Sequence, residues 1–150
     1  MQRIFHTPEG VRDIYNGECS QKRKVQEKIH RVFHQYGYED IETPTFEYFE
    51  VFSREVGTIP SRELYKFFDR EGNTLVLRPD FTPSVSRACA TYFNPDEEPV
   101  SLCYTGNTFI NNSSYRGRLK ETTQMGVEHI GDESADADAE LLAMTVECLL

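Results

Sequence analysis

Two long strand-forming segments joined by a polar loop constrain the fold of this chain more than any other feature. Residues 100–110 and 120–130 are rich in Val, Thr, Tyr, Phe and Ile, and residues 111–114 with Gly117 lie between them. Side chains of the first kind favour strands, while Asn, Ser and Gly favour the connections between strands. We therefore predict two strands that suit the middle of an antiparallel sheet.

Residues 18–36 predict a long amphipathic helix that ends near Gly37. Its apolar side chains recur at helical spacing among charged and amide residues, and they are Val25, Ile29, Val32, Phe33 and Tyr36. Residues 38–43 then alternate apolar with acidic side chains, as a half-buried strand does. Pro44 has no backbone N–H and is expected to end that strand.

A hairpin is predicted from residues 64–69 and 74–78, because the turn between them contains Gly72 and Asn73, which tolerate positive φ. Thr82 and Pro83 resemble the N-cap and first residue of a helix. The apolar stripe expected on that helix is Val85, Ala88, Cys89 and Tyr92.

A last helix is predicted after Ser134, which can cap its N-terminus. Asp136 and Asp138 would then lie beside the positive end of the helix dipole. We expect its core side to include Leu142, Val146 and Leu149. Helices around antiparallel strands predict an α+β fold. Residues 1–150 are expected to form one domain, and the sequence stops inside this helix, which suggests that a longer domain has been cut.

The charge balance argues against nucleic acid as a partner. The formal net charge is −9 and the pI is near 4.9, whereas a broad phosphate-binding surface depends on Lys and Arg. No apolar run approaches the length of a membrane span, and the first ten residues lack the apolar region of a secretory signal. We therefore expect a cytoplasmic protein without membrane contact.

Two patterns of metal-ligand residues are interpreted as structural. The four cysteines are far apart and form no CxxC pair, so we expect reduced thiols, mostly in the core, and neither a zinc site nor a disulfide framework. His30 and His34 have the i, i+4 spacing that can hold a metal, but no third ligand is evident near them in the sequence. We interpret them as surface histidines and expect no metal and no cofactor.

A polar floor is predicted where Asp80 and Thr82 follow the hairpin and Gln124 and Glu128 lie on the second long strand. Residues 124, 126 and 128 point to one face of a sheet, and Gly126 leaves room between its two neighbours. Such groups can bind a cation or an amino-acid ammonium. Alternatively, Thr82 is only a helix cap and the others are exposed polar residues of a strand.

Four blocks occur in the order found in histidyl-tRNA synthetase-like proteins, and the chain resembles this class II family over nearly its whole length. They are TPEGVRDIY at 7–15, YGYEDIETPTFE at 36–47, LVLRPDFTPSVSRACA at 75–90 and GRLKETTQMGVEHIG at 117–131. The resemblance implies a class II aminoacyl-tRNA synthetase-like antiparallel sheet flanked by helices. The helix–strand–proline segment matches motif 1, which implies a homodimer interface, residues 102–131 match motif 2, and motif 3 is absent.

Motif 2 departs from that of an active synthetase at three positions. Ile110 stands where the family has an arginine that holds the α-phosphate of ATP, Asn112 replaces a glutamate, and Thr122 replaces the aromatic residue that stacks under adenine. The resemblance therefore implies that adenylation is abolished and that no residue is catalytic. The positions that line the family's pocket for free histidine are retained, and they are Asp80, Thr82, Gln124 and Glu128.

A lost nucleotide site beside a retained amino-acid pocket is similar to the regulatory subunits of ATP phosphoribosyltransferase within this family. The resemblance implies a noncatalytic partner of the short-form catalytic subunit, in the first step of histidine biosynthesis, with free histidine as feedback effector. One alternative is an active histidine–tRNA ligase with relocated ATP contacts. Another is a dimerisation or signalling module that binds no ligand.

Overall fold

The computed structural model describes residues 5–53, 59–112 and 117–150. Its central sheet has the strand order β1-β5-β6, with β1 at Glu39–Asp40, β5 at Val100–Phe109 and β6 at Glu121–Ile130. The two long strands are paired antiparallel from Val100 opposite Ile130 to Phe109 opposite Glu121, as predicted. Strand β5 lies in the middle of the described sheet and β6 at its edge. Strand β1 runs parallel to β5, so this sheet is mixed.

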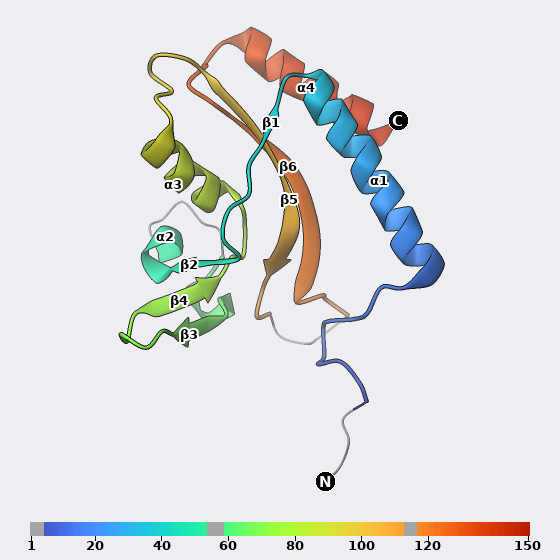
Figure 1. Ribbon diagram of the computed structural model, residues 1–150, viewed down its shortest axis with the longest axis vertical. Coiled ribbons are helices and arrows are strands. Elements are labelled where there is room, and N and C mark those ends of the chain that lie inside the picture. Colours follow the sequence, from blue (N-terminus) through green and yellow to red (C-terminus); the bar gives the residue numbers. More distant parts are fainter. Residues whose placement is uncertain (1–4, 54–58, 113–116) are drawn as a thin grey trace.

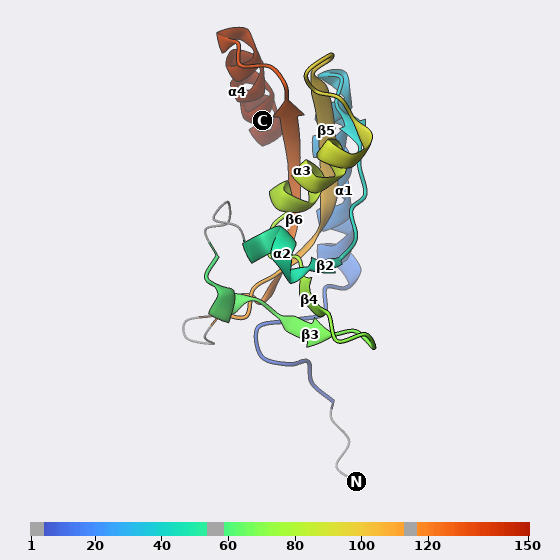
Figure 2. The same ribbon diagram turned by 90° about the vertical axis from the view of Figure 1, so that its left-hand side faces the viewer.

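The central sheet is covered on both faces (Figures 1 and 2). Helices α1 (Asn16–Gln35) and α4 (Ala135–Leu149) lie on one face, and α3 (Thr82–Tyr92) lies on the other. Side chains alternate along a strand, so adjacent residues of β5 serve different cores. The α1/α4 core is Val32, Phe33, Tyr38, Cys103 and Met144. The α3 core is Phe81, Val85, Leu102 and Tyr104.

The predicted first helix is confirmed as α1, and Gly37 follows it with a φ of 82°. The strand predicted over residues 38–43 is shorter, because only Glu39–Asp40 pair with β5. The carbonyl groups of Thr43 and Pro44 accept hydrogen bonds from the Arg78 guanidinium, at 3.0 and 3.4 Å. These two carbonyl groups therefore bind a side chain and do not pair with a neighbouring strand.

A second, antiparallel sheet has the order β2-β4-β3 and lies below α3 in both views (Figures 1 and 2). Strands β3 (Lys66–Phe68) and β4 (Thr74–Leu77) form the predicted hairpin, with Gly72 at a φ of 86° in the turn. Three short elements were not predicted, because they are too brief to show periodicity. They are β2 (Phe46–Tyr48), α2 (Phe49–Ser53) and the 3-10 helix η1 (Ser61–Glu63).

Two helix predictions need correction in α3. Thr82 is the first residue of α3 and Phe81 is the N-cap, so Thr82 does not cap the helix. Its hydroxyl donates instead to the Glu128 carboxylate on β6. Tyr92 is exposed and does not join the apolar stripe, whereas Val85, Ala88 and Cys89 are buried as expected.

Helix α4 begins as predicted, because Ser134 Oγ accepts from the backbone N–H of Ala137 at 3.2 Å. The predicted core side was wrong: Leu142, Val146 and Leu149 are exposed. The side chains that pack inward are Leu141, Met144 and Cys148. Both sets have helical spacing, so periodicity alone does not choose between them.

The predicted loop between the long strands lies partly at residues 113–116, outside the described residues. The cysteines are free, as expected, with Cys89 and Cys103 buried and Cys19 and Cys148 half-buried. Among the helices of the described residues, none combines the length and the apolar composition that a membrane span requires.

Candidate functional site

The four residues of the predicted polar floor lie on the face of the central sheet that α3 covers. Asp80 lies two residues before α3, Thr82 is the first residue of α3, and Gln124 and Glu128 come from β6. Tyr104 joins them from β5, where it lies opposite Gly126. We call this group the carboxylate cluster, and its members are Asp80, Thr82, Tyr104, Gln124 and Glu128.

Hydrogen bonds connect the whole carboxylate cluster. Thr82 Oγ1 donates to Glu128 Oε1 at 2.6 Å, and the Tyr104 hydroxyl lies 3.5 Å from the same oxygen. The amide of Gln124 donates to Asp80 Oδ1 at 3.3 Å and to the Tyr104 hydroxyl at 3.4 Å. The structure thus brings all four predicted residues together, through a tyrosine that the prediction missed.

The Tyr104 ring occupies the space above Gly126, between Gln124 and Glu128. A Cβ added at Gly126 would lie 2.6 Å from Cζ of Tyr104, so only glycine allows this ring to cross the strand. Phe81 stacks on the same ring, with centroids 4.3 Å apart and planes at 10°. The pairing of Gly126 with an aromatic residue across the hairpin is the signal that could have revealed Tyr104.

The cluster is rich in negative charge and partly removed from water. Burial raises the pKa of Glu128, and the charge of Asp80 raises it further, while the hydrogen bond from Thr82 opposes both effects. Burial also raises the pKa of Tyr104 to about 12, so its hydroxyl keeps its proton. Among the described residues, no ion pair involves Asp80 or Glu128. Two carboxylates without a cationic partner can accept an ammonium or imidazolium group.

Arg78 lies beside the carboxylate cluster but is committed to the fold. Its guanidinium is buried, and besides Thr43 and Pro44 it donates to the carbonyl of Asn107 at 2.8 Å. It also stacks on the Phe81 ring at 4.1 Å from the centroid. A Cβ at Gly106 would meet this guanidinium at 2.5 Å, so the glycine makes room for it. Nε and Nη1 of Arg78 therefore join its own segment of backbone to two others, and the guanidinium is buried within the fold.

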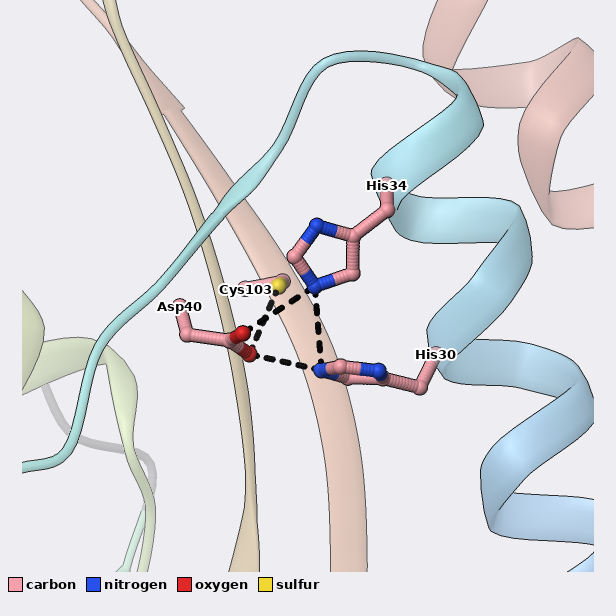
Figure 3. Close-up of side chains that lie close together, drawn as sticks. All are labelled: His30, His34, Asp40 and Cys103. Carbon is pink, nitrogen blue, oxygen red and sulfur yellow. Dashed lines mark hydrogen bonds and ion pairs between the residues drawn. The ribbon is translucent and has the colours of Figure 1, made fainter.

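A second polar group lies on the opposite face of the central sheet (Figure 3). His30 and His34 of α1 face Asp40 of β1 and Cys103 of β5, and all four ligand atoms lie within 4.8 Å of one another. We call these residues the histidine–cysteine cluster. The sequence showed no third ligand near the two histidines, whereas the fold supplies two more groups. Burial raises the pKa of the Cys103 thiol to about 12.

Comparison with known proteins identifies the family. A family model described as histidyl-tRNA synthetase matches residues 10–150. The chain belongs to the histidyl-tRNA synthetase family. This membership agrees with the α+β fold and with the order of the four sequence blocks.

The similar members of this family include proteins named as regulatory subunits of ATP phosphoribosyltransferase and proteins named as histidine–tRNA ligases. The ATP phosphoribosyltransferase regulatory subunit of Ruminiclostridium cellulolyticum is 46% identical over 97% of the chain and 35% of its own length. The structure of an ATP phosphoribosyltransferase regulatory subunit/histidyl-tRNA synthetase from Bacillus halodurans superposes with a TM-score of 0.87. It is 35% identical, over 99% of this chain and 38% of the other.

A histidine–tRNA ligase subunit from Alicyclobacillus acidocaldarius has a TM-score of 0.83 at 28% identity, over 99% of this chain and 42% of the other. The fold is therefore shared by relatives with either name. The chain spans about 35% of the length of the curated relative.

The three positions at which the family resemblance expects ATP-binding residues, Ile110, Asn112 and Thr122, lie at the loop end of the β5–β6 hairpin. The backbone N–H of Ile110 donates to the carbonyl of Lys120 at 2.9 Å, and Asn112 Nδ2 donates to the carbonyl of Leu119 at 3.3 Å. The hydroxyl groups of Thr122 and Thr108 lie 3.0 Å apart. These contacts all hold the two strands together.

Proposed function

We propose that this chain belongs to a regulatory subunit of ATP phosphoribosyltransferase that binds free histidine and does not activate it. The observation that carries the proposal is the aliphatic side chain of Ile110 at the position where the family resemblance expects the arginine for the α-phosphate of ATP. The name of the Ruminiclostridium relative supports it.

The missing guanidinium supports the proposal on energetic grounds. An arginine that stabilises phosphoryl charge is worth about 10³-fold or more in rate, and Ile110 has no side-chain hydrogen-bond donor. Arg78 is no substitute, because backbone carbonyls of Asn107 and Thr43 already accept from its guanidinium. The protein is therefore proposed to be noncatalytic, without a catalytic residue in this chain.

We propose the carboxylate cluster as the pocket for free histidine. The ammonium and imidazole of the ligand would be recognised by Asp80 and Glu128, with Gln124 and Thr82 fixing the carboxylate geometry. This assignment is supported by the absence of a cationic partner for Asp80 or Glu128 in the described ion pairs. Charge-assisted hydrogen bonds are about twice as strong as neutral ones, so these carboxylates would dominate the affinity.

The regulatory role requires a partner. We propose that the complete protein assembles with a short-form catalytic subunit of ATP phosphoribosyltransferase in the cytoplasm, and that it forms a homodimer through the segment of α1 and β1. Free histidine can inhibit such an assembly if it binds one conformation more tightly than another. A coupling free energy of about 1–3 kcal/mol gives a useful feedback response.

The competing function is a histidine–tRNA ligase, which the name of the Alicyclobacillus relative favours. Histidine-dependent exchange of pyrophosphate into ATP separates the two functions. We expect no exchange above background with the complete protein that carries this chain, whereas a ligase gives steady turnover. Turnover would overturn the proposed function, and co-purification with a short-form catalytic subunit would support it.

The pocket is tested by histidine titration into the Glu128→Gln protein. Glutamine keeps the size and an acceptor for Thr82 but removes the charge, so the affinity for histidine should fall by roughly tenfold, as for the loss of about 1.4 kcal/mol. Glu121→Gln is the matched control. Glu121 lies on the same strand, but its side chain points to the opposite face and accepts a hydrogen bond from Asn107. Equal affinities in the two variants would remove Glu128 from the pocket.

A further inference from the structure

The histidine–cysteine cluster is built by regular secondary structure. His30 and His34 occupy one face of α1 at i and i+4, and Asp40 is the direct partner of Cys103 in the parallel pairing of β1 with β5. Four potential ligands thus converge from three elements (Figure 3). Sites on helices and strands hold their geometry better than sites on loops.

The contacts in this cluster exceed what hydrogen bonds can satisfy. His30 Nε2 lies 2.7 Å from Asp40 Oδ1, His34 Nε2 lies 3.0 Å from Asp40 Oδ2, and the two nitrogens lie 3.1 Å apart. Each nitrogen carries at most one hydrogen. If both Nε2 atoms carry a hydrogen, each can donate to Asp40, but the two N–H groups then face each other. If one Nε2 atom lacks its hydrogen, its lone pair faces a carboxylate oxygen of Asp40. Protons therefore satisfy at most two of the three contacts.

A cation among these atoms removes the conflict, because it receives a lone pair from every one of them. We propose that His30, His34, Asp40 and Cys103 form a tetrahedral Zn²⁺ site that links α1 to the central sheet. Two imidazole nitrogens, one carboxylate oxygen and one sulfur are ligands typical of zinc. Hard cations such as Mg²⁺ and Ca²⁺ prefer oxygen ligands alone.

The spacing of the ligand atoms suits this coordination. Zinc bonds of about 2.0–2.3 Å give a tetrahedron with edges of about 3.3–3.8 Å. The Cys103 sulfur lies 3.5 Å from Asp40 Oδ1, and the nitrogen and oxygen contacts are a few tenths of an ångström shorter than such edges. All four ligand atoms lie within 4.8 Å of one another, so rotations of the exposed histidine and aspartate side chains would both open the space for the ion and bring every ligand atom to bonding distance.

The surroundings allow a cation to enter and to be neutralised. The side chains of His30, His34 and Asp40 are 41%, 44% and 57% exposed, whereas Cys103 is buried beneath them. Glu27 and Glu42 line the adjoining surface hollow of about 480 Å³. On binding, the Cys103 thiol releases its proton to solvent, and the thiolate with the Asp40 carboxylate balances the two positive charges of zinc.

Zinc and cobalt titrations of the complete, untagged protein test the proposal. We expect one Zn²⁺ per chain, in competition with a chromophoric chelator. Co²⁺ should give intense visible bands of tetrahedral coordination and a near-ultraviolet band from sulfur to cobalt. His34→Asn and Asp40→Asn should each weaken Zn²⁺ binding by about tenfold or more, the cost of losing even an outer-shell partner. His6→Asn, at an exposed histidine outside the cluster, should leave the affinity unchanged.

The sulfur ligand has its own test. Cys103→Ser should abolish the sulfur-to-cobalt band, and Cys89→Ser, at another buried cysteine, should keep it. Should Cys103→Ser fail to fold, the wild-type spectrum and the two exposed variants still decide the question. The proposal is overturned by a wild-type cobalt spectrum without a sulfur band, or by His34→Asn and Asp40→Asn proteins that bind zinc as tightly as the His6→Asn control.

Discussion

The two faces of the central sheet carry polar clusters of opposite character, although Cys103 and Tyr104, one from each, are adjacent in β5. In the carboxylate cluster, donors and acceptors match: Thr82 donates to Glu128, and Gln124 donates to Asp80. In the histidine–cysteine cluster, the contacts outnumber the available protons. Among the described residues, the first cluster therefore lacks only a cationic partner for its two carboxylates, whereas the contacts of the second conflict until an ion is present.

This difference separates the effects expected from mutation. Disturbing the α3 face should lower folding stability directly, because its groups are buried or half-buried and hydrogen-bonded to one another. Disturbing the α1 face should change metal binding much more than the stability of the metal-free chain, because its charged groups are largely exposed.

The largest loss of stability is expected from Arg78→Met. The substitution leaves the carbonyl acceptors of Asn107 and Thr43 without their buried donor and removes the stacking on Phe81. We expect the free energy of unfolding to fall by about 3 kcal/mol or more, measured by urea denaturation. The control is Arg62→Met, whose side chain is 82% exposed; it should change stability by less than about 0.5 kcal/mol. Similar values for both variants would contradict a structural role for Arg78.

A smaller loss is expected from Gly126→Ala. The added methyl group would collide with the Tyr104 ring, which Phe81 holds in place by stacking. Overpacking of this kind costs about 1–3 kcal/mol, and urea denaturation measures it. Gly17→Ala is the matched control, because a Cβ at Gly17 in α1 meets nothing within 4 Å. That variant should be unchanged or stabilised by less than about 1 kcal/mol, and an equal loss in both would exclude the collision as the cause.

Much of the fold could be predicted where the sequence has strong periodicity. Helix α1 and the hairpins β3–β4 and β5–β6 were all predicted, because long amphipathic patterns and turn residues specify them locally. The face of α4 was not predictable in this way. Leu142 and Leu141 both fit helical spacing, and tertiary packing alone buries Leu141.

The two clusters were predictable to different degrees. Strand alternation and the family resemblance predicted that Asp80, Gln124 and Glu128 lie close together. Their role in binding stays a prediction. The proximity of Asp40 and Cys103 depends on a parallel pairing between residues 63 positions apart. No local sequence pattern predicts such a pairing, so Asp40 and Cys103 could not be identified as ligands from the sequence.

The charge of Glu128 should give the α3 face a pH-dependent stability. Burial raises the pKa of Glu128, so the folded chain retains a proton that the unfolded chain has already released. The contribution of protonated Glu128 to the free energy of unfolding is fully present below about pH 4.3, the ordinary pKa of glutamate. It is lost as pH rises through the raised pKa of the folded chain. Wild type should therefore lose stability relative to Glu128→Gln as pH rises toward neutrality. Urea denaturation across this range measures the gap, and a gap of the opposite sign would refute the effect of burial.

The smallest effect should come from Asp40→Asn in the presence of a chelator. Exposed ion pairs contribute about 0.2–1 kcal/mol, so the metal-free variant should lose less than about 1 kcal/mol in thermal or urea denaturation. Excess zinc should raise the stability of wild type more than that of Asp40→Asn, because a ligand that binds the native state adds its binding free energy to the free energy of unfolding. Asp132→Asn is the matched control, since Asp132 also lies near a histidine, 3.7 Å from His129 Nε2. If zinc widened the gap equally for both variants, the stabilisation would come from elsewhere on the protein, and the contrast between the two faces would disappear.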